Sequence, residues 1–493
     1  MAASAAMTMC ERHDASVEFN LLGTGTVNLC RLTNSVVFDW AWHGLAGLLA
    51  TLFVCQPMVA SAQSLRFIRD AEIEDLLADY AKPVFRAAGL GSQHIKVRVI
   101  QDNTFNAFVL DGRNVFINTG ALVQAETPNA VIGVLAHETG HIAGGHMAAL
   151  RAKISRDASM AMLMQIMGIG AMIAGATGNM GDKATTTGIG QSVLSATPDI
   201  AQRSILSYRR VQEYSADQAG IKFLTATHQS GKGMLVTFQK FADEEMLAGV
   251  GGGSSYLSSH PMARDRIAQL TQLASASPYF DDLDPPERQL RHDLMRAKLV
   301  GFLETPQAVF NHYPASNTSL AARYARSIAA FNGSALDQAL GLIDGLIRDK
   351  PDYGYFWEQK ADFLAKRGKH AEAVAALRKA LEMIPSQSLF QAELAQELLG
   401  TQDKRYLPEI VKLLRKAVVA DENSDAYRQL ATAYFGLGQE GEADLASAQA
   451  SALEGRTKDA KGFAKRAQAI LPAGSQGWLK ADDILNIQEQ QSQ

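Results

Sequence analysis

The C-terminal third of the sequence repeats a pattern of small and large apolar residues, and this pattern restricts the fold more than any other feature. In the stretch 352–385 the pattern comprises Trp357, Ala361, Leu364, Gly368, Ala371, Ala375, Ala380 and Pro385. In the stretch 424–457 it comprises Tyr427, Leu430, Ala431, Tyr434, Gly436, Gly438, Ala443 and Ala448. Such a pattern is typical of helix-turn-helix repeats of about 34 residues, in which small side chains let paired helices approach closely. We therefore expect residues 316–493 to form all-α, tetratricopeptide-like repeats, with a plain helical bundle as the alternative.

The part of the chain before the repeats has a different period. Residues 65–93 have helical spacing, whereas 95–100, 107–110 and 115–117 alternate like strands. We expect these strands to form a small antiparallel sheet. A further helix is expected to begin at Pro128, and it would carry apolar residues into a histidine-containing motif.

A chain of 493 residues is too long for one compact core, so more than one domain is expected. Residues 276–292 are rich in proline and mixed charge and indicate a domain boundary. The predicted organisation is a mostly helical α+β domain over 63–275, a linker over 276–315, and the repeats. Lys and Arg total 47 against 51 Asp and Glu, a net charge of -4. A nucleic-acid-binding protein usually has a basic excess, so we expect no nucleic-acid partner.

The N-terminus indicates export. Residues 44–55 form an apolar run that is too short to span a bilayer comfortably, and an A-x-A pattern follows at 60–62. This arrangement predicts a secretory signal within an N-terminal extension over 1–62, cleaved after Ala62. The alternatives are a retained anchor and, because a signal of this length is unusual, a start codon downstream of Met1.

A second apolar run covers residues 158–176. Its length permits a membrane span, but its glycine and methionine content also suits a buried or groove-lining helix. We favour a groove-lining segment or one that touches a membrane peripherally.

The motif with the clearest chemistry is His137-Glu138-Thr139-Gly140-His141. On a helix, His137 and His141 lie one turn apart on the same face, so both imidazoles can bind one metal ion. Glu138 then projects beside the ion, where it can take a proton from a water molecule. The apolar residues 131–136 favour a buried helix over the alternative of two unrelated surface histidines.

A catalytic zinc site needs a third protein ligand. The three cysteines of the chain all precede residue 56, so the ligand must be a histidine or a carboxylate. We expect it to be Glu213. Asp217 lies one turn later on the same helical face, where it can accept a hydrogen bond from an imidazole N–H, that of His137. The alternative is an ordinary solvated acidic face.

Together these motifs resemble those of the HtpX and CAAX-prenyl-protease superfamily of gluzincin metallopeptidases. The resemblance covers roughly residues 70–275. It includes the stretches 137–141 and 213–217, His260-Pro261 with the later Arg266, Asn106-Ala107-Phe108 and Asn118-Thr119-Gly120. It implies a zincin-like fold with one Zn²⁺ per chain, bound by His137, His141 and Glu213, and Glu138 as the general base.

The resemblance also implies roles for residues outside the ligand set. Asn106, Ala107 and Phe108 would bind substrate, since a strand matching 106–110 or 114–118 would pair with an extended peptide. His260 would either donate to the developing oxyanion or be a fourth ligand that closes the resting enzyme, and a capping histidine before a proline is the structural alternative.

Two more residues near these motifs need an interpretation. Arg266 would orient His260 or bind substrate carbonyls, and we count both residues with Glu138 as catalytic. His146 lies five residues after His141, off the ligand face, and we interpret it as structural.

With an export signal and C-terminal repeats, the whole chain is similar to periplasmic members of this family. The resemblance implies a zinc metalloendopeptidase in outer-membrane protein quality control. Its repeats would recruit unfolded or misassembled outer-membrane proteins, or the outer-membrane assembly machinery. Two alternatives stay open. One is a chaperone or scaffold for outer-membrane assembly with a latent protease, and the other is a membrane-anchored quality-control protease.

Overall fold

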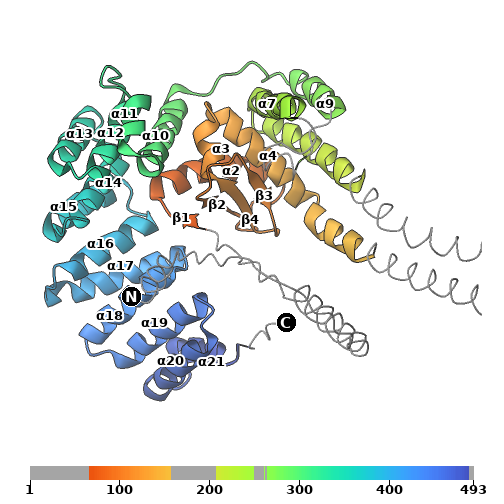
Figure 1. The fold of residues 1–493 in the computed structure, drawn as a ribbon. Coiled ribbons are helices and arrows are strands. Elements are labelled where there is room, and N and C mark those ends of the chain that lie inside the picture. Colours follow the sequence, from red (N-terminus) through yellow and green to blue (C-terminus); the bar gives the residue numbers. More distant parts are fainter. Residues whose placement is uncertain (1–65, 157–206, 249–259, 261–263, 488–493) are drawn as a thin grey trace, which may run out of the picture. The chain divides into compact units, whose positions relative to one another are not determined.

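The computed structural model describes residues 66–156, 207–248, 260 and 264–487 (Figure 1). The first part of the chain contains a small sheet and several helices. Its strands are β1 (Phe67–Ile68), β2 (Lys96–Ile100), β3 (Ala107–Val109) and β4 (Asn114–Asn118). Its helices are α2 (Ala71–Ala87), α3 (Thr119–Gln124), α4 (Pro128–Ala143), two helices described over 146–156 and 207–226, α7 (Lys232–Ala248) and α9 (Arg264–Ser275).

The sheet has the strand order β1-β2-β4-β3. β1 pairs with β2 and β3 pairs with β4 in antiparallel fashion, but β2 and β4 are parallel. The prediction of a purely antiparallel sheet is therefore wrong at its centre. After β2 the chain runs to the far edge as β3, and β4 then returns between the two, in the same direction as β2. The strand β1 was not predicted from the sequence. It lies within residues 65–93, which were expected to be helical, and the helix begins only at Ala71.

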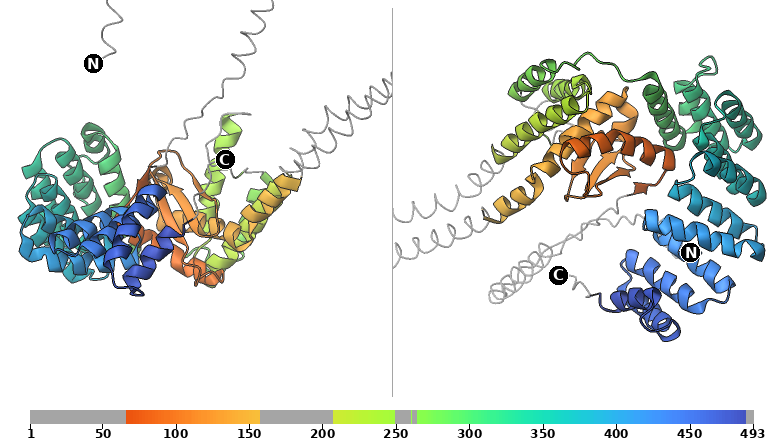
Figure 2. Two further views of the ribbon diagram at one scale, coloured as in Figure 1. Left: turned by 90° about the horizontal axis from the view of Figure 1, so that it is seen from below. Right: turned by 180° about the vertical axis from the view of Figure 1, so that it is seen from behind.

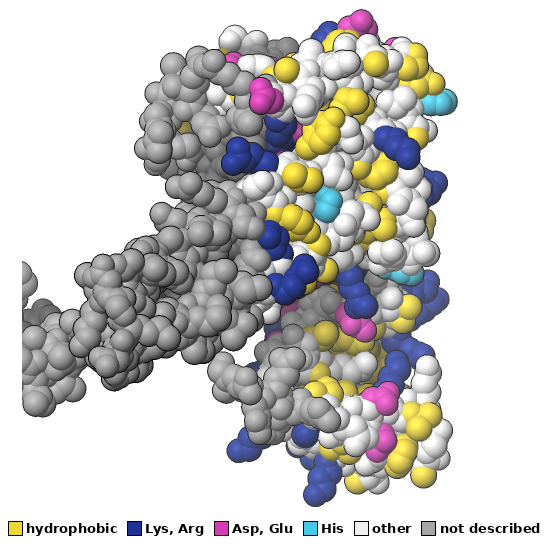
Figure 3. All heavy atoms as spheres, turned by 90° about the vertical axis from the view of Figure 1, so that its right-hand side faces the viewer, with side chains coloured by type: hydrophobic (Ala, Val, Ile, Leu, Met, Phe, Trp, Pro, Cys, Tyr) yellow, Lys and Arg dark blue, Asp and Glu magenta, His cyan; other side chains and the backbone are white. Residues whose placement is uncertain are grey.

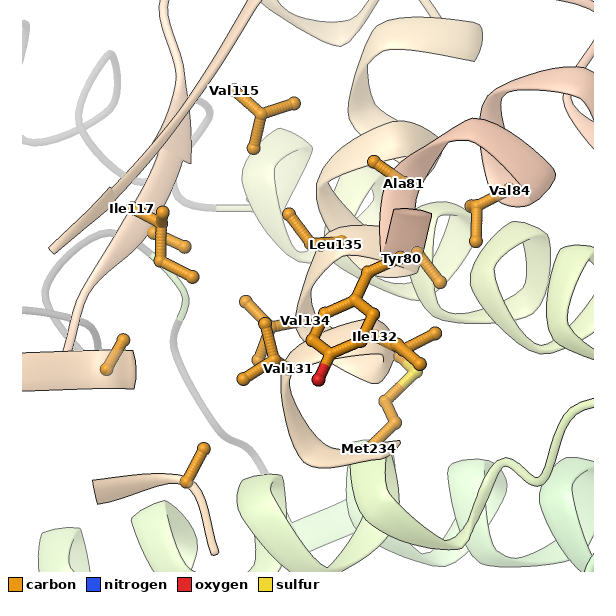
Figure 4. Close-up of a cluster of buried hydrophobic side chains, with 14 of the residues drawn as sticks. Tyr80, Ala81, Val84, Val115, Ile117, Val131, Ile132, Val134, Leu135 and Met234 are labelled. Carbon is orange, nitrogen blue, oxygen red and sulfur yellow. The ribbon is translucent and has the colours of Figure 1, made fainter. Parts of the chain in front are cut away.

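A shared hydrophobic core lies between the sheet, α2 and α4. Val115 and Ile117 of β4 point into this core, as the two-residue alternation of a strand requires. Apolar side chains of α4 lie between those of β4 and α2 (Figure 4). The helix itself begins with Pro128 at its first turn, and the Thr127 side chain accepts a hydrogen bond from the backbone N–H of Ala130. α4 is thus held firmly beneath the sheet, beside its edge strand β3.

The repeats consist of paired antiparallel helices that follow one another in sequence order (Figure 2). The two predicted stretches each contain a pair, α14 (Gly354–Ala365) with α15 (His370–Met383) and α18 (Ser424–Gly436) with α19 (Glu440–Leu453). The other helices are α12 (Leu320–Asn332), α13 (Leu336–Asp349), α16 (Ser388–Gly400), α17 (Leu407–Ala420), α20 (Thr457–Ile470) and α21 (Gln476–Leu485). Gly368 and Gly438 occupy equivalent turns with φ of 72° and 73°, a conformation that favours glycine. The predicted fold class, an α+β domain followed by all-α repeats, is confirmed.

The segment expected to be a linker is helical instead. It contains α10 (Pro286–Leu303) and α11 (Pro306–His312). Met295 and Leu299 of α10 are buried in the core of the sheet-containing part, and Leu294 is buried in a core of the repeats. Residues 286–312 therefore form a structural connection between the two parts.

A buried lysine on α10 reinforces this connection. Lys298 is 1% exposed, and its Nζ lies 2.7 Å from Asp70, 3.4 Å from Glu72 of α2 and 3.2 Å from Glu358 of α14. Glu72 also accepts a hydrogen bond of 2.6 Å from the Tyr353 hydroxyl. Burial disfavours the ammonium charge, but the surrounding carboxylates raise the pKa of Lys298. Within the compact unit Leu65–Gln493, this cluster ties α2 to the repeats.

The exposed surface carries both hydrophobic and charged side chains. On the face drawn in Figure 3, hydrophobic side chains alternate with Lys and Arg, and acidic side chains are fewer. Among the helices of the described residues, none combines the length and the apolar character needed to cross a bilayer. The runs 44–55 and 158–176 lie outside the described residues, as does the predicted cleavage site.

Replacing Lys298 by alanine should destabilise the protein strongly, because it leaves buried carboxylates without their counter-charge. We expect the free energy of unfolding, measured with urea, to fall by about 3–5 kcal/mol. The control is Lys379→Ala, since Lys379 forms a surface pair with Glu382, and its removal should cost less than about 1 kcal/mol. Equal stabilities of the two variants would contradict this assignment.

Candidate metal centre

Four side chains from three segments meet beneath the sheet. His137 and His141 come from α4, Glu213 from the helix over 207–226, and His260 from the segment before α9. All four are buried, with at most 6% of each residue exposed. One donor atom from each lies within 4.8 Å of the others, an arrangement that could hold a metal ion.

Glycines let the two main helices of the site approach each other. A Cβ on Gly140 would lie 2.7 Å from the carbonyl oxygen of Ala216, and one on Gly220 would lie 3.2 Å from the backbone nitrogen of His137. A larger residue at position 140 would therefore push the helices apart. This close approach brings Glu213 within reach of the two histidines of α4.

The separations between donor atoms fit zinc. His137 Nε2 lies 3.1 Å from His141 Nε2, 3.3 Å from His260 Nδ1 and 3.4 Å from Glu213 Oε2. Glu213 is also 3.4 Å from His141 Nε2 and 3.0 Å from His260 Nδ1. Ligands about 2.1 Å from a tetrahedral zinc ion are separated by about 3.4 Å. The residues thus fit the ion, and His260 occupies the place of a fourth donor.

Behind the ligands, Asp217 and Arg266 form a buried charged layer. Asp217 Oδ1 lies 2.9 Å from His137 Nδ1, so it can accept that N–H and hold the ring with Nε2 toward the centre. Arg266 contacts Asp217 through Nε at 2.5 Å and Glu213 through Nη1 at 2.9 Å. Its guanidinium also lies over the ring of Phe238, which packs edge-on against His137. These contacts connect Arg266 to the ligand carboxylate, whereas the sequence had suggested contacts with His260 or substrate.

Glu138 differs from the other acidic residues of the site. It is fully buried, and within the described residues neither of its carboxylate oxygens has a hydrogen-bond partner. The imidazole of His260 lies close by, with its Nε2 3.5 Å from Glu138 Oε1. Burial raises the pKa of Glu138, and the neighbouring His260 opposes this shift. A buried carboxylate without a partner, beside a possible metal site, is suited to accept a proton.

The protonation of the ligands follows from their surroundings. Burial lowers the pKa of His141 to about 3, so its lone pair is available to a metal. Burial also opposes the charge of His137, but hydrogen bonds to Asp217 and Glu213 outweigh it and raise the pKa to about 9. Burial likewise opposes ionisation of Glu213, yet the adjacent histidines hold its pKa well below the usual range. A metal must therefore displace a proton from His137, and acid should weaken its binding.

The residues expected to bind substrate lie partly at the site. Asn106 and Phe108 line a cavity of about 300 Å³ together with Glu138 and His141. Ala107 instead faces the core and is fully buried. In the described part of the chain β3 is an edge strand, whereas β4 lies between two strands. Of the two strands considered, 106–110 and 114–118, the first therefore lies at an edge of the described sheet and the second does not.

The stretch 118–120, matched by the sequence resemblance, supports this edge from behind. The Asn118 N–H donates to the carbonyl of Asn106, and a Cβ on Gly120 would lie 2.2 Å from the carbonyl oxygen of Asn103. These residues therefore hold the loop that leads into β3.

Other residues of the cavity were not foreseen. They are Met147, Leu150, Arg209 and Gln212, whereas Val109 and Leu110 belong to the strand 106–110 that was expected to bind substrate. Met147 and Leu150 are one turn apart on the helix over 146–156, a spacing that could have indicated a common apolar face.

Comparisons with known proteins give a family match for each of the two parts of the chain. Residues 68–274 match the model of Peptidase family M48, and residues 336–475 match a tetratricopeptide repeat model. A β-barrel assembly-enhancing protease of Yersinia pestis is 24% identical over 387 residues, which cover 76% of this chain and 75% of that protein. Its namesake of Escherichia coli K12 is 21% identical over 76% of this chain and 75% of its own. The protease HtpX of Alcanivorax borkumensis is 26% identical over 52% of this chain and 93% of its own.

The ligand set can be tested by metal analysis. His137→Ala removes a donor from the centre of the cluster, so we expect the purified variant to lose most of the zinc that the wild type retains. The matched control is His312→Ala, because His312 is exposed and distant from the site in the sequence. Equal zinc contents in His137→Ala and the wild type would contradict the assignment.

Proposed function

We propose that this chain, a metalloprotease with an M48 peptidase domain and tetratricopeptide repeats, is a periplasmic zinc endopeptidase in the quality control of outer-membrane proteins. The observation that carries the proposal is the convergence of His137, His141 and Glu213 at zinc-ligand spacing, beside the buried carboxylate of Glu138, which has no hydrogen bond within the described residues. The name shared by two relatives, β-barrel assembly-enhancing protease, supports the outer-membrane context.

The chain's own residues supply the proton transfers of peptide hydrolysis. A zinc ion held by His137, His141 and Glu213, one per chain, would polarise the peptide carbonyl and lower the pKa of a water molecule. Glu138 takes the proton of the attacking water on a carboxylate oxygen and passes it to the leaving amine. The raised pKa of Glu138 suits both steps, because a carboxylate with a low pKa accepts the water proton poorly, and the protonated acid must still be able to donate it. Asp217 keeps the His137 ring in place throughout.

His260 is best interpreted as a fourth ligand that closes the resting site. Its Nδ1 lies at ligand spacing from both His137 and Glu213. A catalytic zinc site needs one open position, so His260 would have to withdraw before hydrolysis. His260 also lines the cavity beside β3, where an oxyanion donor would lie, so the role of fourth ligand rests on the spacing of its Nδ1.

The edge of β3 supports binding of an extended peptide. Asn106 bonds to Asn118 of β4, and bonding alternates along an antiparallel pair. The backbone groups of Ala107 and Val109 therefore point to the open edge. A substrate strand that pairs there would run past Glu138.

The cavity beside this edge suits an apolar side chain. Phe108, Leu110, Met147 and Leu150 supply its apolar lining. Strands of outer-membrane barrels alternate apolar and polar residues, so an unassembled strand would present an apolar side chain at every second position. This match supports misfolded or stalled outer-membrane proteins as substrates.

The remaining parts of the proposal concern location and recruitment. A signal cleaved after Ala62 would deliver the chain to the periplasm, and the stretch 158–176 would touch a membrane peripherally. The repeats would recruit substrates or the outer-membrane assembly machinery. Recovery of the mature protein in a soluble periplasmic fraction would support this location and would argue against a membrane-anchored protease.

Replacing Glu138 by glutamine tests the chemistry. The amide keeps the shape of the side chain but cannot accept the water proton, so kcat should fall by about 10²–10⁴ while zinc content is unchanged. Cleavage of an unstructured reporter peptide by purified wild type and variant gives the comparison. A Glu138→Gln variant with wild-type kcat would overturn the assignment.

Replacing His260 by alanine separates its two candidate roles. If His260 closes the site, the variant should keep zinc on three ligands and cleave an unstructured peptide severalfold faster than the wild type. If it is an oxyanion donor, kcat should instead fall by about 10²–10³. Steady-state kinetics with zinc quantified in the same sample distinguishes the outcomes.

The closed four-donor arrangement also favours one competing function, a chaperone or scaffold for outer-membrane assembly with a latent protease. Complementation of a deletion strain by Glu138→Gln addresses it. Full restoration of outer-membrane assembly by this variant would favour the chaperone, whereas loss of complementation at normal protein levels would favour the protease.

A further inference from the structure

We propose that His146 is a positioning residue that holds the metal ligand His141 in its binding orientation. The sequence suggested only a structural role, because position 146 is off the ligand face of the helix. The structure nevertheless brings the two rings together, with His146 Nδ1 3.1 Å from His141 Nδ1. The inference rests on the metal site of the proposed function.

The two nitrogens of His141 face different partners. Nε2 points to the donor cluster, 3.1 Å from His137 Nε2 and 3.4 Å from Glu213 Oε1. Nδ1 points away from the cluster toward His146. The rings of His141 and His146 lie nearly perpendicular, with an interplanar angle of 84°. Both residues are buried, so water has little access to this contact.

The direction of the hydrogen bond follows from metal ligation. A neutral imidazole carries one proton, and a nitrogen that binds a metal must offer its lone pair. When His141 binds through Nε2, its proton is therefore on Nδ1, and this N–H must donate. His146 Nδ1 accepts it, and the contact selects the tautomer and ring orientation that ligation requires. His146 thus serves His141 as Asp217 serves His137.

The backbone between the two histidines is built to allow this contact. α4 ends at Ala143, and Gly145 adopts a φ of 61°, which interrupts the helical path before the helix over 146–156 begins. The His146 ring then lies over Gly144, where a Cβ would be 2.3 Å from its Nε2. The ring can occupy this place only because residue 144 has no side chain.

The helix that carries Glu213 holds the other side of His146. Gln212 Nε2 donates a 3.0 Å hydrogen bond to the carbonyl of His146. Gln212 is 7% exposed, and its neighbour Glu213 is the carboxylate of the donor cluster. The position of His146 is therefore tied to the segment that supplies the third ligand.

Two isosteric substitutions separate hydrogen bonding from packing. His146→Asn keeps an acceptor, because Asn Oδ1 replaces Nδ1, whereas His146→Leu has the same branched shape and no acceptor. In the full-length protein we expect His146→Leu to weaken zinc affinity, measured by chelator competition, by about 10–100-fold. His146→Asn should lose less than about tenfold. The visible absorption of the cobalt-substituted protein should change in the leucine variant and stay close to wild type in the asparagine variant.

Gly144→Ala provides an independent test in case His146→Leu does not fold. Residue 144 has a φ of -77°, so alanine causes no backbone strain and acts by displacing the His146 ring. We expect a loss of zinc affinity similar to that of His146→Leu. The control is Gly462→Ala, since a Cβ there meets no atom within 4 Å.

The outcomes distinguish this inference from the function it rests on. Wild-type protein that takes up neither zinc nor cobalt refutes the metal site itself. Wild type that binds both metals, with His146→Leu or Gly144→Ala binding them equally well, refutes only the role of His146. Equal losses in His146→Leu and His146→Asn would also overturn it, because they would assign the effect to ring packing.

Discussion

Helix α4 and the helix over 207–226 touch through backbone atoms, and the site depends on this contact. Gly140 packs on Ala216 and Gly220 packs on the backbone of His137. A methyl group added at either glycine would separate the helices and move Glu213 away from both histidines. A metal ion tolerates deviations of only a few tenths of an ångström in the distances to its ligands. Most of the sheet-containing part can be understood as support for this contact, since α4 is buried against β4 on one side and α7 on the other.

Because the two helices are so close, the site contains buried carboxylates, and several neighbouring side chains together compensate their negative charge. Glu213 and Asp217 are ionised and almost fully buried, and isolated carboxylates in such a place would be very costly. Arg266 contacts both, and the imidazoles supply the remaining donors. A dication at the centre would complete the balance of charge. Glu138 stands apart because, within the described residues, neither of its carboxylate oxygens accepts a hydrogen bond, which leaves them available to exchange a proton.

The periodicity of the sequence predicted those features that lie within a single helix or a single strand. The pairs His137/His141 and Glu213/Asp217 follow from the pitch of a helix, and the structure brings all four together. The parallel pairing of β2 and β4 could not be predicted this way, because both kinds of pairing share a two-residue alternation. The prolines of 276–292 indicated a domain boundary, yet Pro286 occupies the first turn of α10, where proline is favoured. The contact of His146 depends on the helix interruption at Gly145, and the regular period of a helix does not predict it.

The lysine on α10 has a consequence for how such a protein can evolve. Lys298 neutralises carboxylates on α2 and beside it, and another on α14, so neither half of the chain balances its own buried charge. A protease domain joined to the repeats of another protein would bring Asp70 and Glu72 to helices without counterparts of Glu358 and Tyr353. Recombination between the two halves is therefore expected to lower the stability of the protein. The two halves should be inherited as one unit and not exchanged as separate modules.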